Sequence, residues 1–368
     1  MIGTSPDGSH AGQRRLIRPQ ARVADEVLGA DVQLVHVAEL IDREALRPSL
    51  AHETERQTDR VRRAHDAAAQ LPLLAGGVAG TTLPLRRASY TDRLAVPVEV
   101  TTTRDAMWAT DNLVEVMVSG CQIVTTASRF AEDLLAFCSP AFGYVRLHDA
   151  HCRASVHLPQ KRNPYALTVL RGGASMAIGR TTGVLTTVRT PTAQSDNWMH
   201  TYGEVLGTIE HAAVLVALAA EVVEHMHVCT DKLGERALSG FTDATDLAEQ
   251  LAVVSGADYR SAHRAVGALA SKAEAEGRDR FSEADLLELN LADRPPREPA
   301  ASVAARNVPG GADPGEVRRQ ARRLLRRTAA RRQWREEQSA LAATTRANLL
   351  AEAAAAAGPS SAGSAAAG

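Results

Sequence analysis

The stretch from Asp105 to Cys138, DAMWATDNLVEVMVSGCQIVTTASRFAEDLLAFC, decides the fold. Its apolar and small residues recur every three or four positions, which is the spacing of one face of an α-helix. These residues are Met107, Val114, Met117, Cys121, Val124, Ala127, Ala131, Leu134 and Cys138. No charged side chain occurs between Val116 and Ser128. Because a helix that is apolar all round is buried, we expect this one to begin near Asp105 and to lie inside a helical bundle or between subunits.

The composition favours helices along the whole chain of 368 residues. Apolar residues make up 45% of the chain and aromatic residues only 4%, so the core must consist mainly of Ala, Val and Leu. These side chains let helices approach closely and have moderate or high helix propensity. We therefore predict an all-α fold.

Charge and hydropathy exclude several classes of protein. A net charge of −1 differs from that of a globally basic nucleic-acid binder. The most apolar stretch, Ala212 to Val223, is shorter than the roughly 18 residues that span a bilayer, and it contains Glu221. The N-terminal sequence MIGTSPDGSH has no secretory pattern, and the cysteines lack C-x-x-C spacing. We expect a cytoplasmic protein with no membrane span and with reduced cysteines.

The segment SVHLPQKRNP, Ser155 to Pro164, carries the strongest chemical signal. It combines Ser155 with Lys161, one of only three lysines in the chain. Asn163 before a proline predicts the N-cap of a helix that runs to about Val188. Free backbone N–H groups at a helix start favour anions, so the segment suits a carboxylate or phosphate. The alternative is an ordinary surface loop between two prolines.

The rest of the chain divides by composition into helical segments and loops. Further helices are predicted at Asn197–His227, Asp243–Ser255, Tyr259–Glu276, Ser282–Leu291 and from Pro314 onward. The predicted domains are a loose extension at residues 1–30, a reduced N-terminal part with a central bundle at 31–235, a small helical C-terminal domain at 236–325, and a basic helix with a disordered Ala/Gly/Ser tail at 326–368.

SVHLPQKRNP resembles the GSSxMPxKxNP signature of the aspartase/fumarase superfamily, and its QKxNP part resembles argininosuccinate lyases. Other segments resemble the same family in the same order; they are LPLLAGGVAGTTLP (71–84), SRFAEDLLAF (128–137), FTDATDLAEQLAVVSGADYRSAHRAVG (241–267) and VAARNVPGGADPGEV (303–317). The resemblance implies a long central helical bundle with a small helical C-terminal domain. It also implies a homotetramer in which three chains complete each active site, with no cofactor and no metal.

The resemblance implies β-elimination from a substituted succinate, an N-substituted aspartate, with release of fumarate. Ser155 matches the general base that takes the proton from Cβ. Lys161 matches the residue that stabilises the doubly charged aci-carboxylate, and Asn163 matches a donor to that carboxylate. Gln160 is expected to contact the same dicarboxylate substrate.

This sequence departs from the family pattern at several positions. The Gly and second Ser of the signature are Ala154 and Val156, and the segments T-H-x-Q-x-A-Q-P and S-R-N-D are absent from the chain. The first of these carries the usual acid His, so we expect His157 to act as the acid, with His200 as a further acid or substrate ligand. The alternative is a catalytically impaired homologue that serves as a partner subunit or scaffold in a mixed oligomer.

Two further features have competing explanations. His148, His151, Cys152 and His157 surround Ser155 without regular metal-ligand spacing, so unpaired loop histidines are expected rather than a metal site. Residues 316–368 contain ten Arg and four Glu. A basic helix face of this kind can bind nucleic acid or an acidic partner, but without an aromatic platform we expect a solvated face.

Overall fold

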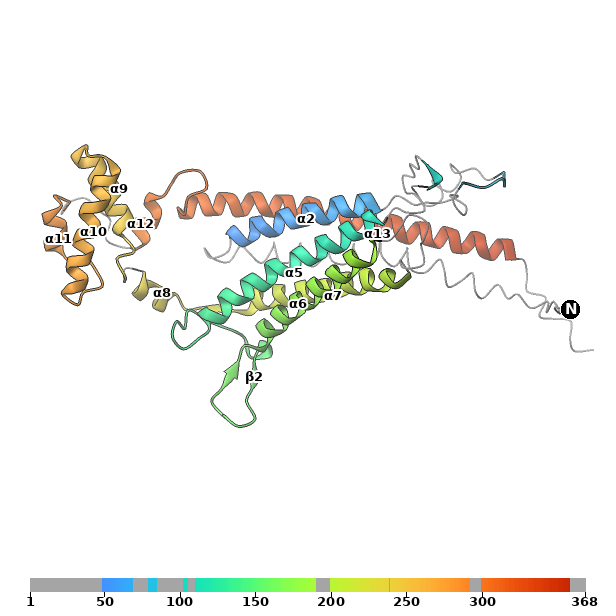
Figure 1. Ribbon diagram of the computed structural model, residues 1–368, viewed down its shortest axis with the longest axis horizontal. Helices are drawn as coiled ribbons and strands as arrows, with labels where there is room; N and C mark the ends of the chain where they lie inside the picture. The colour runs from blue at the N-terminus through green and yellow to red at the C-terminus, as the bar shows by residue number, and fades with distance from the viewer. Residues whose placement is uncertain are drawn as a thin grey trace, which may run out of the picture.

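The computed structural model describes residues 48–68, 79–84, 102–104, 110–189, 199–237, 239–291 and 299–357. Long helices pack side by side along the middle of the molecule (Figure 1). They are α2 (Pro48–Ala68), α5 (Asp111–Phe137), α6 (Tyr165–Thr187), α7 (Met199–His225) and α13 (Pro314–Ala357). The predicted all-α fold with a long central bundle is confirmed.

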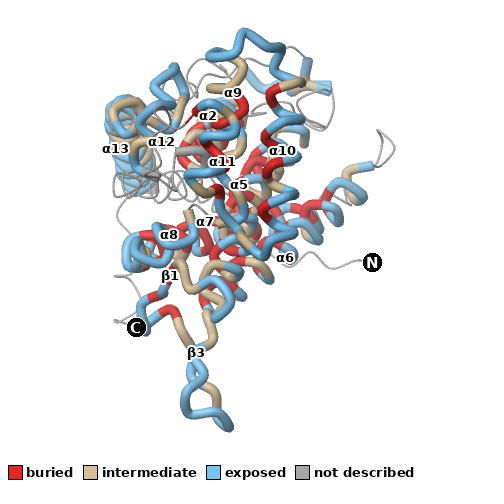
Figure 2. The backbone as a smooth tube through the Cα atoms, turned by 90° about the vertical axis from the view of Figure 1, so that its left-hand side faces the viewer, coloured by how far each residue is buried: buried red, intermediate tan, exposed pale blue. Residues whose placement is uncertain are grey.

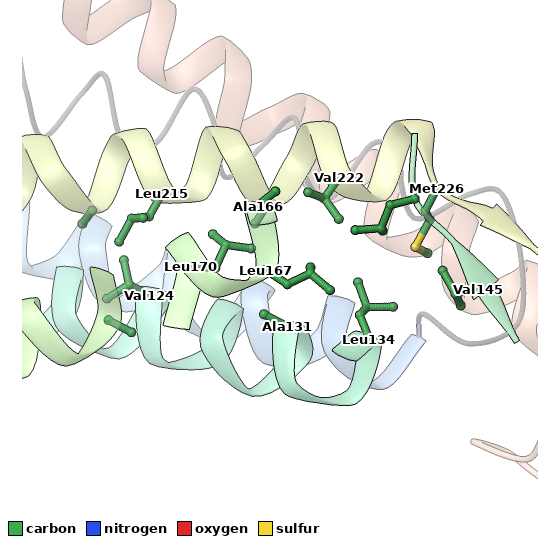
Figure 3. Close-up of a cluster of buried hydrophobic side chains, with 14 of the residues drawn as sticks. Val124, Ala131, Leu134, Val145, Ala166, Leu167, Leu170, Leu215, Val222 and Met226 are labelled. Carbon is green, nitrogen blue, oxygen red and sulfur yellow. The ribbon is translucent and has the colours of Figure 1, made fainter. Parts of the chain in front are cut away.

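The interior of the bundle lies where α5, α6 and α7 meet (Figure 3). Val124 and Leu134 of α5, Leu167 and Leu170 of α6, and Leu215 of α7 are buried in one cluster. Small residues let the helices come close, as the composition predicted. A Cβ on Gly173 of α6 would stand only 2.6 Å from a methyl group of Leu215, so a larger residue here would force the Leu215 side chain to move.

Helix α7 is the most apolar part of the described chain. By length and composition it could cross a membrane, with a mean hydropathy of 1.7 over its most apolar window. The expectation that no apolar segment approaches that length was therefore wrong. Half of the window is buried inside the protein against the neighbouring helices, and this burial explains its apolar character.

Helices α2 and α13 join the two ends of the described chain along one side of the bundle (Figure 1). Arg331 lies 2.7 Å from Asp59 and 3.4 Å from Glu55, and Arg327 lies 2.9 Å from Glu55. Leu324 of α13 is buried in the core cluster that α2, α5 and α7 share. The expectation of a solvated basic face is therefore wrong for this side of α13, because acidic residues of α2 neutralise it.

Short strands lie at one end of the bundle. Strand β1 (Val145–Arg146) pairs with β4 (His227–Val228), and β2 (Arg153–Ala154) pairs antiparallel with β3 (Arg162–Asn163). The prediction that Asn163 caps the helix was wrong. Asn163 pairs with Arg153 in the β2–β3 ladder, and Pro164 occupies the N-cap position of α6. An Asn before a proline is compatible with an N-cap and with a strand, because a residue that precedes proline favours the extended conformation.

A smaller helical unit follows the bundle. It contains α8 (Thr230–Arg236), α9 (Ala244–Ser255), α10 (Tyr259–Ala275), α11 (Glu283–Glu288) and α12 (Pro299–Ala305). Its core includes Leu247, Leu269 and Leu286. Asp285 accepts hydrogen bonds from Arg278 and from the backbone of Ser282 in a capping box, and Arg278 is the main cause that lowers the pKa of Asp285 to about 2.

Several predicted boundaries move in the structure. The described part of α5 begins at Asp111, and residues 105–109 lie outside the described chain. Helix α13 is continuous from Pro314 to Ala357, so the boundary predicted between residues 325 and 326 falls inside it. It ends at Ala357, well inside the segment 326–368 for which a basic helix and a disordered tail were expected. The predicted extension at residues 1–30 lies outside the described residues, as do residues 358–368.

Candidate active site

The segment with the strongest chemical signal forms a β-hairpin that projects from the end of the bundle (Figures 1 and 2). We call residues 153–163, which include β2 and β3, the signature hairpin. Arg153 pairs with Asn163, and Ala154 pairs with Arg162. The next positions in the same register are Ser155 and Lys161, one at each end of the connecting loop. The hairpin therefore places these two predicted site residues where one short loop begins and ends.

The hydroxyl of Ser155 is held by the backbone of its own loop. Its Oγ accepts hydrogen bonds from the backbone N–H groups of His157, at 3.3 Å, and Leu158, at 3.1 Å. The N–H of Lys161 in turn donates to the carbonyl of Leu158, at 3.0 Å, which closes the turn. Backbone donors directed at an oxygen stabilise negative charge on it. This arrangement suits a serine that must lose its proton.

Two arginines anchor the signature hairpin at its base. Arg162 donates to the carbonyl of Leu147 at 3.0 Å and forms an ion pair with Asp149. The guanidinium of Arg153 lies over the ring of Tyr165, the first residue of α6, at 5.4 Å from its centroid. The base of the hairpin is thus fixed to both flanking segments, whereas its tip faces solvent.

The other predicted residues of this segment differ in exposure. His157, Gln160 and Lys161 are exposed, and Asn163 is half-buried in β3. Among the described residues, the hydrogen-bond partners of the Ser155 hydroxyl are backbone groups and no side chain reaches it. The hairpin therefore presents a hydroxyl, a cation and an imidazole on one loop, in which His157, Gln160 and Lys161 are exposed.

His200 lies far from the signature hairpin within one chain. Helices α6 and α7 run antiparallel, since Arg180 in the second half of α6 lies 3.8 Å from Glu204 near the start of α7. The hairpin precedes α6, whereas His200 is the second residue of α7. The length of α6, 23 residues, separates them by about 34 Å. His200 of the same chain therefore does not meet Ser155.

The structure groups the histidines differently from the sequence. His148 and His151 lie beside His225 at the end of α7, with ring centroids 5.8 to 6.3 Å apart, and His157 is not among them. The 3-10 helix η3 (Asp149–His151) carries His151, whose side chain is 7% exposed. Burial lowers the pKa of His151 below its usual value, and Glu221 opposes that effect. In the described chain, no three His, Cys, Asp or Glu side chains are arranged to hold a metal.

The cysteines of this region act as packing residues. Cys138 and Cys152 are half-buried against the core cluster of α5, α6 and α7. Burial, with a smaller contribution from Cys152 and Cys229, raises the pKa of the Cys138 thiol to about 11. A thiol with so high a pKa stays protonated and is a poor nucleophile near neutral pH.

The antiparallel bundle and its hairpin define a class of fold shared by several solved lyases. A structure of EDDS lyase in complex with formate has a TM-score of 0.76, with 21% identity over 92% of this chain and 74% of that one. A class II fumarase from Schistosoma mansoni has a TM-score of 0.57, with 15% identity over 74% of this chain and 66% of that one.

Sequence comparisons identify the family. The family model described as Lyase matches residues 48–179, and the model described as Argininosuccinate lyase C-terminal matches residues 241–304. The argininosuccinate lyase of Thioalkalivibrio sulfidiphilus is 33% identical over 68% of this chain and 55% of its own length. That of Mycolicibacterium smegmatis is 33% identical over 73% of this chain and 59% of its own length. The chain belongs to the aspartase/fumarase superfamily and is argininosuccinate lyase-like, and it spans less than two thirds of these curated relatives.

Proposed function

We propose that this protein catalyses a β-elimination on an N-substituted aspartate and releases fumarate. Its named relatives are argininosuccinate lyases, and a structural neighbour with a TM-score of 0.78, a variant of EDDS lyase, was solved with bound fumarate. The observation that carries the proposal is the signature hairpin, in which two backbone N–H groups hold the Ser155 hydroxyl at one end of the loop and Lys161 stands at the other end.

The proposed reaction uses the residues of the hairpin in distinct roles. Ser155 Oγ takes the proton from Cβ of the substrate, and the N–H groups of His157 and Leu158 stabilise the oxygen while it is deprotonated. The electron pair of the C–H bond passes to the carboxylate as an aci-carboxylate, which Lys161 and Asn163 stabilise. This electron pair then forms the double bond of fumarate, while the C–N bond breaks and its electrons leave with the amine.

The leaving amine requires a proton in this reaction. The His157 imidazole is exposed on the same loop, and imidazole is the side chain most often used as a general acid near neutral pH. Gln160 is exposed beside Lys161 and binds the carboxylates of the substrate in this proposal. No cofactor and no metal takes part, and the protein acts as a soluble enzyme.

We propose further that the protein acts as a homotetramer, in which other copies enclose the hairpin and supply His200. The exposed face of α6 supports this assembly. Gly172, Gly179 and Gly183 share that face, and a Cβ on any of them would meet nothing within 4 Å in this chain. Met176 between them is 55% exposed. Glycine weakens a helix by about 1 kcal/mol relative to alanine, so a close contact with another chain would explain these residues.

Replacing glycines on this face is expected to break the assembly without unfolding the chain. In Gly172→Leu with Gly179→Leu, each new side chain has space within one protomer but would overlap a closely packed neighbour, at about 1–3 kcal/mol per site. We expect dissociation to smaller species in light scattering, at unchanged helix content. Gly267→Leu on α10, where a Cβ also meets nothing within 4 Å, is the matched control. An unchanged mass for the double variant would contradict the proposed interface.

The function is tested by fumarate release from a panel of N-substituted aspartates that includes argininosuccinate. We expect ultraviolet absorbance to report fumarate from at least one member of the panel. The second candidate function is that of an impaired partner subunit, and it is favoured because no side chain of the described residues contacts the Ser155 hydroxyl. No release by the protein alone, with activity only after mixing with an inactive Ser-to-Ala variant of a full-length relative, would favour the partner subunit over the independent enzyme.

A further inference from the structure

Three imidazole rings meet where the signature hairpin joins the end of α7. We call His148, His151 and His225 the histidine cluster; their ring centroids lie 6.3 Å, 5.8 Å and 6.1 Å apart in the three pairs. His148 precedes η3 and accepts a hydrogen bond from the N–H of Ala150 at its Nδ1. His225 ends α7, where its Nδ1 lies 3.0 Å from the carbonyl oxygen of Glu221. The cluster thus connects two segments that are far apart in the sequence.

His151 is the buried member of the cluster. Its side chain is only 7% exposed, and its buried Nδ1 has no hydrogen-bond partner among the residues that the structure describes. Its Nε2 lies 3.9 Å from the carboxylate of Glu221. A buried imidazole with one unpaired nitrogen is more easily accommodated neutral than charged, because a buried cation requires partners for its protons. Burial accordingly lowers the pKa of His151, and His225 and His148 lower it further, against the opposing effect of Glu221.

The charged groups around His151 leave its protonated form poorly compensated. Glu221 is the carboxylate that interacts with it from α7, and His225 lies on the same helix. On the other side of η3, Asp149 is already paired with Arg162 of β3. On α6, which also contacts η3, Tyr165 is covered by Arg153 and Arg171 is paired with Glu132. Among the described residues, the carboxylate that faces His151 is that of Glu221, which is itself exposed.

The position of His151 in the chain connects this cluster to the site. Its N–H donates to the carbonyl of His148, and the N–H of Cys152 donates to that of Asp149, so η3 is one tight turn. Strand β2 begins directly after Cys152, and Ser155 follows β2. Displacement of His151 from the end of α7 would therefore displace the first strand of the signature hairpin.

Resting on the proposed function, we propose that His151 is a positioning residue for the signature hairpin and that its protonation releases the hairpin from the end of α7. At neutral pH the buried His151 ring is neutral, and η3 stays docked. Once η3 is released, His151 is solvated and regains an ordinary pKa of about 6.5. The docked state therefore binds fewer protons than the released state, so release becomes favourable as the pH falls below 6.5.

Hydrogen exchange tests this inference without requiring catalysis. Amide protection in peptides that cover residues 147–154 is measured in the full-length protein between pH 7.5 and 5.5, and is corrected for the intrinsic pH dependence of exchange. We expect protection to fall by up to about tenfold at pH 5.5. This is the largest effect that one group can have when the pH is one unit below its pKa in the released state. In His151→Phe, which keeps an aromatic ring and removes the ionisable group, protection should change less than about twofold over the same range.

The controls separate this inference from general acid unfolding. His263→Phe on α10, remote from the hairpin, should behave as the parent, and peptides of α9 and α10 should keep their protection at pH 5.5. If His151→Phe does not fold, the His151 ring is titrated in the parent by NMR. An ordinary pKa for His151, constant protection in the parent, or an equal loss in His151→Phe would each overturn the proposal. Because no outcome depends on fumarate release, failure of the proposed function is detected separately.

Discussion

Ser155→Ala is expected to lower the rate of fumarate release by about 10²–10⁴-fold, which is the usual contribution of a positioned general base. The loss should lie in kcat, because the hydroxyl acts on the transition state rather than on substrate binding. The fold should not change, since Ser155 lies in a loop at the tip of the signature hairpin and its hydroxyl contacts only the backbone of that loop. Ultraviolet absorbance of fumarate measures the rate, and circular dichroism checks the helices.

A matched serine makes this experiment specific. Ser175 lies exposed on α6, where its hydroxyl donates to the carbonyl of Arg171 one turn earlier. Ser175→Ala removes the same atom from the surface of a helix and should leave the rate within about twofold of the parent. Retention of most of the activity in Ser155→Ala would exclude Ser155 as the base, whatever the result for Ser175→Ala.

Arg331→Glu is expected to separate α13 from the bundle. The Arg331 side chain is only 12% exposed and pairs with both Glu55 and Asp59 of α2. Reversal of its charge places three carboxylates together at a half-buried site, where loss of one partner alone costs about 3–5 kcal/mol. Urea unfolding should report a loss of this size, and hydrogen exchange should show lost protection in α2 and α13.

Arg326 provides the control on the same helix. It is exposed on α13 and has no ion pair among the described residues, so Arg326→Glu changes the net charge equally without opposing a carboxylate of α2. Its effect on the free energy of unfolding should be below about 0.5 kcal/mol, as for ordinary surface positions. Equal effects of the two reversals would mean that the contact between α2 and α13 contributes little to stability.

Much of the fold could be predicted because periodicity and composition record burial. Apolar and small residues recur every three or four positions in the long helices, and Gly and Pro mark where these helices end. Together these signals located α5, α6 and α7 to within a few residues. The partner of α13 was missed because each helix was considered by itself. The sequence did contain a signal. Glu55 and Asp59 are four residues apart, and so are Arg327 and Arg331, so each pair lies on one face of its helix and the two faces have opposite charge.

The candidate site was predictable only in its local part. Ser155, Lys161 and Asn163 lie in one short segment, so the sequence alone placed them together, and the structure folds this segment into a hairpin in which Asn163 pairs with Arg153. His151 was grouped with His157 because they are close in the sequence, yet its neighbour is His225, which lies on another helix. No local pattern predicts such a pair, since it depends on where the end of α7 meets the turn before β2. His200 was predicted to join the site, but the length of α6 separates it from the hairpin within one chain.

The contact between α2 and α13 also determines the order in which this protein can fold. His52 and Gln320, whose side chains lie 3.3 Å apart, are separated by 268 positions in the sequence. A ribosome that has made α2, α5, α6 and α7 has not yet made the helix that covers the acidic side of α2. Contacts of such large sequence separation form late and slow folding, because the chain between them must first be ordered. The bundle is therefore completed only after synthesis has passed the whole C-terminal unit, and until then Glu55 and Asp59 remain without their cationic partners.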